Sequence, residues 1–219
     1  MSSILDLLKN KFVFDVGCNV GNKTLAYQSA GASVIGFEPQ PEVAAVYQQR
    51  TGAPVEVIAL ADEESTKPFW RNQSGSGLSS MCKEFMDAWQ PIRKDPWDEP
   101  VSIPTSTLDH MISKYGRPYY IKLDVEGFEL QLLQGLSQPV EIISLEWSTP
   151  CKEAGYACLD YLGRTNYYNF VIGDSLEFIS PIWRNYKEIS KFLNQYTSLE
   201  VGDVFIKRSS AIVSDSHPE

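Results

Sequence analysis

Short apolar runs that alternate with helix-compatible stretches constrain the fold of this 219-residue chain more than any other feature. Each run has the length of a buried strand, and the residues between two runs suffice for a helix. Strands that alternate with helices in this way lie parallel in one sheet, so we expect an α/β fold. The predicted strands are 11–16, 33–37, 55–60, 101–108, 119–123, 141–145, 170–172 and 204–206, and the predicted helices include 1–10, 22–30, 42–50 and 128–133.

The alternation is interrupted between residues 71 and 104. This segment contains the run RNQSGSGLSS, followed by two tryptophans and several prolines. A connection of this length without a regular pattern is unusual inside a compact domain and often covers an active site. We therefore expect one domain over residues 1–219, with an insertion at about 71–104 that covers the substrate.

Composition excludes several classes of partner and site. The formal net charge is −9, and an acidic surface repels phosphate backbones, which argues against nucleic acid. No apolar run approaches the roughly 18 residues of a membrane span, and no leader pattern opens the chain, so we expect a cytoplasmic protein without a membrane partner. The four cysteines form no C-x-x-C pair, which argues against a disulfide framework or a thiolate zinc site.

The first predicted strand ends in a motif that suits a bound ligand. Residues 12–21 read FVFDVGCNVG, so Gly17, Asn19 and Gly21 follow the strand at every second position. Glycine lets the backbone approach a ligand closely, and asparagine tolerates a left-handed conformation. The helix that begins near residue 22 directs its free N–H groups at the same crevice.

Glu38 ends the second predicted strand, 21 residues after Gly17. A carboxylate at this place is positioned to accept hydrogen bonds from both ribose hydroxyls of an adenosine. Two requirements of a nucleoside site therefore meet in one half of the predicted sheet.

The glycine spacing distinguishes between two nucleosides. A dinucleotide site requires G-x-G-x-x-G, whereas this chain has G-x-N-x-G preceded by Asp15. A carboxylate there repels a pyrophosphate but suits the amino group or sulfonium of S-adenosylmethionine, so we predict the methyl donor. An NAD-dependent oxidoreductase and a non-catalytic nucleoside-binding module remain as alternatives.

Carboxylates are the candidates for the base that an alcohol acceptor requires. Asp124 and Glu126 follow the strand in IKLDVEGFE, and Glu146 ends the next strand. Like charges packed closely raise each other's pKa, and we expect Asp124 to be the base, with Glu126 or Glu146 as second choice. His110 and His217 lie outside the motifs, and we discount both as bases.

Two further expectations concern the same crevice. The three carboxylates could also bind a divalent cation that holds and acidifies the acceptor hydroxyl. The sequence does not define their number or geometry, so this metal site is an alternative that we do not favour. Trp147 follows the Glu146 strand end, where it would stack on a sugar face.

An ordered set of motifs points to one family. DVGCNVGNKT, GFEPQPE, IALAD, TSTLD, IKLDVEGFE and SLEW occur in this order over residues 12–147, and GDVFIKR follows near the end. Together they resemble the FkbM family of S-adenosylmethionine-dependent methyltransferases, of which IKLDVEGFE is the most characteristic motif.

The resemblance implies a Rossmann-like class I methyltransferase fold, with a mostly parallel seven-stranded sheet, an antiparallel last strand and helices on both faces. It implies O-methylation of a sugar, glycan or small natural product, with N-methylation in a few relatives. It places Ala61 with Asp62 near the adenine of the donor and Glu38 at the ribose. The positions around the methionine part of the donor are Asp15, Gly17, Asn19 and Gly21. Residues 71–104 depart from the family, so the acceptor is not identified, and no oligomeric state follows from the sequence.

Overall fold

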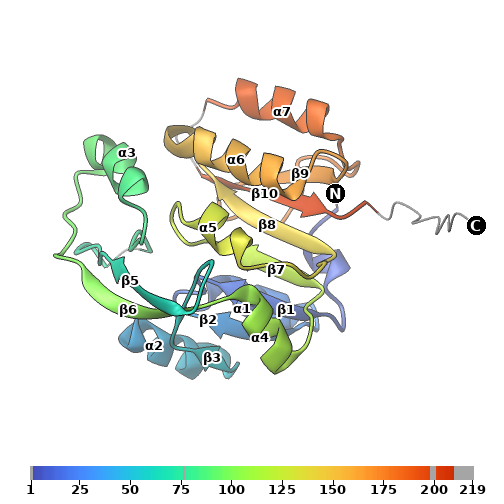
Figure 1. Ribbon diagram of the computed structural model, residues 1–219. Helices are drawn as coiled ribbons and strands as arrows, with labels where there is room; N and C mark the ends of the chain where they lie inside the picture. Colours follow the sequence, from blue (N-terminus) through green and yellow to red (C-terminus); the bar gives the residue numbers. More distant parts are fainter. Residues whose placement is uncertain (1, 76, 198–200, 210–219) are drawn as a thin grey trace, which may run out of the picture.

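The computed structural model describes residues 2–75, 77–197 and 201–209 and contains a seven-stranded sheet in the order β3-β2-β1-β7-β8-β10-β9 (Figure 1). Neighbouring strands are parallel, except that β10 is antiparallel to both β8 and β9. This is the predicted class I arrangement. The strands are β1 (Phe12–Val16), β2 (Ser33–Phe37), β3 (Val55–Glu56), β7 (Tyr120–Leu123), β8 (Ile142–Trp147), β9 (Tyr167–Ile172) and β10 (Gly202–Lys207).

Helices cover both faces of this sheet because successive residues of a strand point to opposite faces. In β1, Val13 packs in a core with Tyr27 of α1, whereas Phe14 packs in a second core with residues of α4 to α7. The helices are α1 (Asn22–Ser29), α2 (Pro41–Thr51), α4 (Leu108–Tyr115), α5 (Glu129–Gln134), α6 (Lys152–Leu162) and α7 (Tyr186–Gln195), with short 3-10 helices η1 (Leu5–Leu7) and η2 (Thr149–Cys151). No helix in the described ranges is both long and apolar enough to cross a membrane.

A small second sheet and one helix form the part of the chain that interrupts the alternation (Figure 1). The sheet has the order β4-β6-β5, with β4 (Ala59–Leu60), β5 (Ser65–Phe69) and β6 (Val101–Ser106). Between β5 and β6 lies α3 (Lys83–Arg93), which buries Phe85, Met86 and Trp89. The segment expected to be irregular is therefore folded around a helix with its own apolar face.

Two predicted elements differ from the structure. The expected strand 55–60 is divided, because β2 ends at Phe37 opposite Glu56, after which Ala59–Leu60 pairs with β6 instead. The expected helix 1–10 is reduced to η1, because Ile4 donates its N–H to the carbonyl of Leu176 and is held by this tertiary contact.

Candidate functional site

The turn after β1 depends on left-handed backbone conformations. Gly17, Asn19 and Gly21 have φ values of 72°, 46° and 84°. A Cβ on Gly17 would lie 1.8 Å from the carbonyl oxygen of Asp124, so this glycine lets the ends of β1 and β7 approach each other. A Cβ on Gly21 would lie 2.4 Å from a side-chain carbon of Thr51, so packing of the turn against α2 requires glycine at position 21.

Glu38 connects this turn to the end of β2. Its Oε2 accepts a hydrogen bond from the backbone N–H of Asn19 at 3.1 Å, and its Oε1 accepts one from the backbone N–H of Gln40 at 3.0 Å. Burial raises the pKa of Glu38, and these hydrogen bonds oppose that shift because they favour the charged form. The carboxylate is thus held in one orientation at the strand end.

A cavity lies along the carboxyl ends of β1, β2 and β7. Polar groups on its wall include Asn19, Glu38, Asp124 and Glu126, and the remaining lining residues are Val16, Gly17, Phe37, Pro39, Gln40, Ile58, Ala59, Leu60, Phe69, Gly77, Ser79, Met81 and Val125. The wall therefore combines apolar side chains with three carboxylates. Such a wall suits a ligand with an aromatic base and polar groups.

Three predicted donor residues do not line the cavity. Ala61 is fully buried behind the wall, and Asp62 forms an ion pair with Lys67 at 3.1 Å. The N–H of Ala61 donates to the carbonyl of Ser106, which continues the pairing of β4 with β6. Gly21, the third, contacts α2 as described above.

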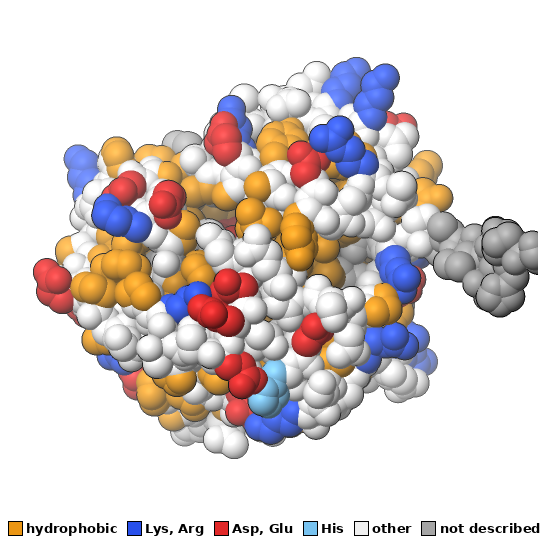
Figure 2. Space-filling model, in the orientation of Figure 1, with side chains coloured by type: hydrophobic (Ala, Val, Ile, Leu, Met, Phe, Trp, Pro, Cys, Tyr) orange, Lys and Arg blue, Asp and Glu red, His pale blue; other side chains and the backbone are white. Residues whose placement is uncertain are grey.

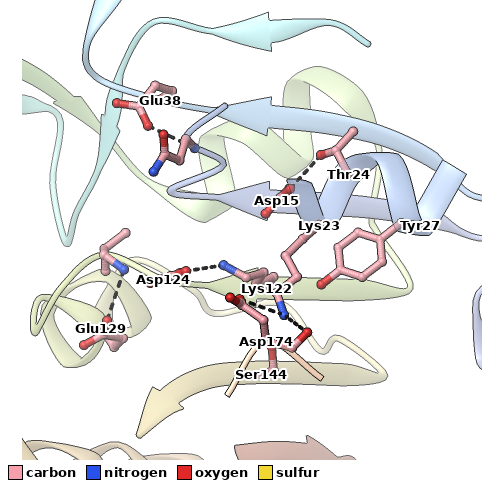
Figure 3. Close-up of polar contacts among 12 residues, drawn as sticks. Asp15, Lys23, Thr24, Tyr27, Glu38, Lys122, Asp124, Glu129, Ser144 and Asp174 are labelled. Atoms are coloured by element: carbon pink, nitrogen blue, oxygen red, sulfur yellow. Dashed lines mark hydrogen bonds and ion pairs between the residues drawn. The ribbon is translucent and has the colours of Figure 1, made fainter. Parts of the chain in front are cut away.

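Asp15 also lies away from the cavity wall. Its Oδ2 accepts a hydrogen bond from the Thr24 hydroxyl at 2.6 Å (Figure 3), because the side chain faces α1. Its buried Oδ1 has no hydrogen-bond partner within the part of the chain that the structure describes. Burial raises the pKa of Asp15, and the charge of Lys122 opposes this shift.

The three predicted catalytic carboxylates lie together. Asp124, Glu126 and Glu146 each offer one oxygen, and these oxygens lie within 4.8 Å of one another. Asp124 follows β7, Glu126 follows two residues later at φ 55°, and Glu146 belongs to β8 rather than following it. Parallel pairing of β7 with β8 brings the two strand ends to one edge, which explains the cluster.

Charge in the cluster is only partly compensated. Nζ of Lys122 contacts Oδ2 of Asp124 at 2.6 Å (Figure 3). Burial lowers the pKa of Lys122, but nearby carboxylates outweigh this and raise it, so its ammonium group stays charged. Burial raises the pKa values of Glu126 and Glu146, and the neighbouring carboxylates raise them further. The predicted direction of these two shifts is therefore correct, but burial is the larger cause.

A second, smaller cavity reaches the cluster from the other side. Glu146 lines it together with Phe85 of α3 and Cys151 of η2. Figure 2 shows the surface hollowed between α3 and α6, with hydrophobic side chains at the rim. The carboxylates consequently lie between two cavities, with Asp124 and Glu126 on the first and Glu146 on the second.

Other candidates do not enter the site. Trp147 is 1% exposed and packs edge-on against Tyr156, so the predicted sugar platform is a core residue. His110 contacts Glu64 on the surface, and His217 lies outside the described residues. Glu129 accepts hydrogen bonds from two backbone N–H groups of the loop before α5, which is a structural role.

The insertion contributes residues that the sequence did not reveal. The Ser80 hydroxyl donates to the carbonyl of Glu126 at 2.7 Å and accepts the N–H of Cys82 at 2.8 Å. No periodic pattern marks Ser80, because its bond to Glu126 joins it to a segment 46 residues away.

A known protein family matches most of the chain. A family model described as the methyltransferase FkbM domain matches residues 15–196. No curated protein matches the chain.

Solved structures also resemble the chain. A TehB-like SAM-dependent methyltransferase from Corynebacterium glutamicum is 9% identical with a TM-score of 0.49, covering 94% of this chain and 85% of that chain. Magnesium protoporphyrin IX methyltransferase from Synechocystis, solved with bound SAM, is 13% identical with a TM-score of 0.48, covering 94% and 74%. Likenesses at these identities carry no information on the substrate.

Proposed function

Because the chain belongs to the FkbM family of S-adenosylmethionine-dependent methyltransferases, we propose that it methylates a hydroxyl of a sugar, a glycan or a small natural product. The observation that carries this proposal is the cluster of Asp124, Glu126 and Glu146 between the two cavities. A hydroxyl acceptor must lose a proton on methylation, and carboxylates at the reacting end supply the base. The net charge of −9 favours such an acceptor over a nucleic acid.

The residues of the first cavity fit the donor. Glu38 presents a carboxylate for the ribose hydroxyls, and Ile58, Leu60 and Phe69 supply an apolar wall for the adenine, in place of Ala61 and Asp62. The donor, when bound, supplies a methyl group on a positively charged sulfur. Asp15 favours that positive charge through its unpaired Oδ1 and its field rather than from the cavity wall.

Asp124 is the proposed base. It lines the donor cavity, and its side chain is 33% exposed, so a hydroxyl can reach it. Asp124 takes the hydroxyl proton while the methyl carbon leaves sulfur and bonds to that oxygen. Most of the rate acceleration then comes from holding the two reactants in line, which the walls on both sides of the cluster provide.

The surface hollow between α3 and α6 (Figure 2) is the proposed acceptor side, because the second cavity beside it has room for only about one water molecule. Phe85, which lines that cavity, supplies an apolar surface there. In this arrangement the insertion at 71–104 covers the acceptor, within one domain over residues 1–219. Ser80 fixes the cover to the carboxylate loop through Glu126.

The experiment is methyl transfer from donor labelled in its methyl group to a panel of sugars and small alcohols, with matched amines and fully O-methylated sugars as controls. We expect label on free hydroxyls and equal formation of S-adenosylhomocysteine. Label on the amines alone would contradict the hydroxyl proposal. Binding of donor without product across the panel would favour the non-catalytic module.

A further inference from the structure

We propose that Asp124, Glu126 and Glu146 bind a divalent cation that prefers oxygen ligands, such as Mg²⁺ or Mn²⁺. Their three oxygens lie within 4.8 Å of one another. Opposite ligands of Mg²⁺ are about 4 Å apart and those of Ca²⁺ up to about 5 Å, so small side-chain movements suffice to coordinate one ion. The proposed cation binding depends only on these three residues. The role of the cation in catalysis rests on the proposed function.

A buried atom without a partner gives the second reason. Glu126 is 8% exposed, and its buried Oε2 accepts no hydrogen bond from any described residue. Burying a carboxylate without a partner is costly, and a cation at this point would remove the cost. By contrast, Glu129 nearby is satisfied by backbone N–H groups.

Protein cations do not balance the cluster. Lys122 pairs with Asp124, and its charge also serves Asp15 and Asp203. Among the described residues, no ion pair reaches Glu126 or Glu146. Two carboxylates are therefore left for a bound cation to neutralise.

The kind of cation follows from the ligands. All three are carboxylates, without histidine or cysteine, and hard oxygen ligands select Mg²⁺, Mn²⁺ or Ca²⁺ over softer metals. Three protein oxygens leave coordination positions for water and for a substrate oxygen. Ser80 holds the backbone of Glu126, which keeps one ligand in place while the others close around the ion.

The position of the cluster assigns the ion a role in the proposed function. Because Glu146 lines the small cavity beside the hollow between α3 and α6, an acceptor hydroxyl that enters from that hollow would become a further ligand. Coordination makes a hydroxyl more acidic and fixes its direction.

The test is titration of the chelator-treated full chain with Mn²⁺ alone, followed by electron paramagnetic resonance and calorimetry, without donor or acceptor. We expect one Mn²⁺ per chain, competition by Mg²⁺, and a rise in melting temperature with Mn²⁺. Glu126→Gln and Glu146→Gln should each weaken binding roughly tenfold or more, since even residues outside the first ligand shell cost 10- to 100-fold.

Asp87→Asn is the matched control, because it removes one carboxylate from an exposed ion pair on α3, outside the cluster. It should bind Mn²⁺ like the wild type, and circular dichroism should show all variants folded. Absence of Mn²⁺ binding, or equal binding by wild type and both glutamine variants, would overturn the inference. Methylation of hydroxyls without Mn²⁺ binding would support the proposed function and refute the cation site. Mn²⁺ binding with methylation of amines only would support the cation site and refute the proposed function.

Discussion

Oε2 of Glu38 accepts a hydrogen bond from the backbone N–H of Asn19 over 3.1 Å. This bond joins the end of β2 to the turn after β1, so one carboxylate both belongs to the proposed ribose site and stabilises the left-handed Asn19. The turn is therefore organised before a ligand binds, which reduces the ordering cost of binding.

Replacing Glu38 should weaken donor binding and also the fold. Glu38→Ala removes the ribose acceptor and leaves the N–H of Asn19 without its partner, at a cost of about 1–3 kcal/mol in unfolding free energy. Calorimetry with S-adenosylhomocysteine should show at least a tenfold loss of affinity, and urea unfolding measures the stability. Glu38→Gln keeps an acceptor for Asn19, so it separates the two effects. Unchanged affinity in both variants would remove the ribose assignment.

Donor affinity should fall on acidification. Burial, with a smaller contribution from the charge of Glu42, raises the pKa of Glu38 above its usual 4.5, while the N–H groups of Gln40 and Asn19 oppose this. The charged form accepts ribose hydrogen bonds more strongly. Affinity is therefore greatest above this raised pKa and declines as the pH falls through it. The same titration of Glu38→Gln should lack this decline, and an identical profile would exclude Glu38 as its origin.

Asp124→Asn should reduce turnover far more than donor affinity. Loss of the proposed base should lower kcat by about 10²- to 10⁴-fold. The dissociation constant of S-adenosylhomocysteine should change only a few-fold, because Asp124 contributes at the reacting end of the cavity. Steady-state kinetics with a hydroxyl acceptor and calorimetry measure the two quantities. Full activity would place the base at Glu126 or Glu146.

Gly17→Ala should destabilise the protein by about 2–5 kcal/mol, through both a positive φ and overpacking. The added Cβ would lie 1.8 Å from the carbonyl oxygen of Asp124. Gly52→Ala is the matched control, because Gly52 also has a positive φ of 66° but has nothing within 4 Å of the added Cβ. Thermal unfolding should show the larger loss for Gly17→Ala. Equal losses would mean that the close approach of β1 and β7 is relaxed at little cost.

Sequence patterns predicted those strands and turns whose conformation depends on residues close by in the sequence. Strands β1 and β2 follow from continuous apolar runs, and the conformation of the first turn follows from Gly17 and Asn19, since few residues adopt positive φ. The closeness of Asp124 to Glu146 was also predictable, because parallel strands bring their carboxyl ends to one edge.

The sequence alone determined the alternation of strands and helices, the left-handed turn after β1 and the place of Glu38 at the strand end, because these depend on local backbone preference and on periodic burial. Only the tertiary structure decided that Asp15 faces α1, that Trp147 is core, and that Ser80 of the insertion bonds to the carbonyl of Glu126. Each of these depends on which distant segment packs against a side chain, and no local pattern encodes such a contact.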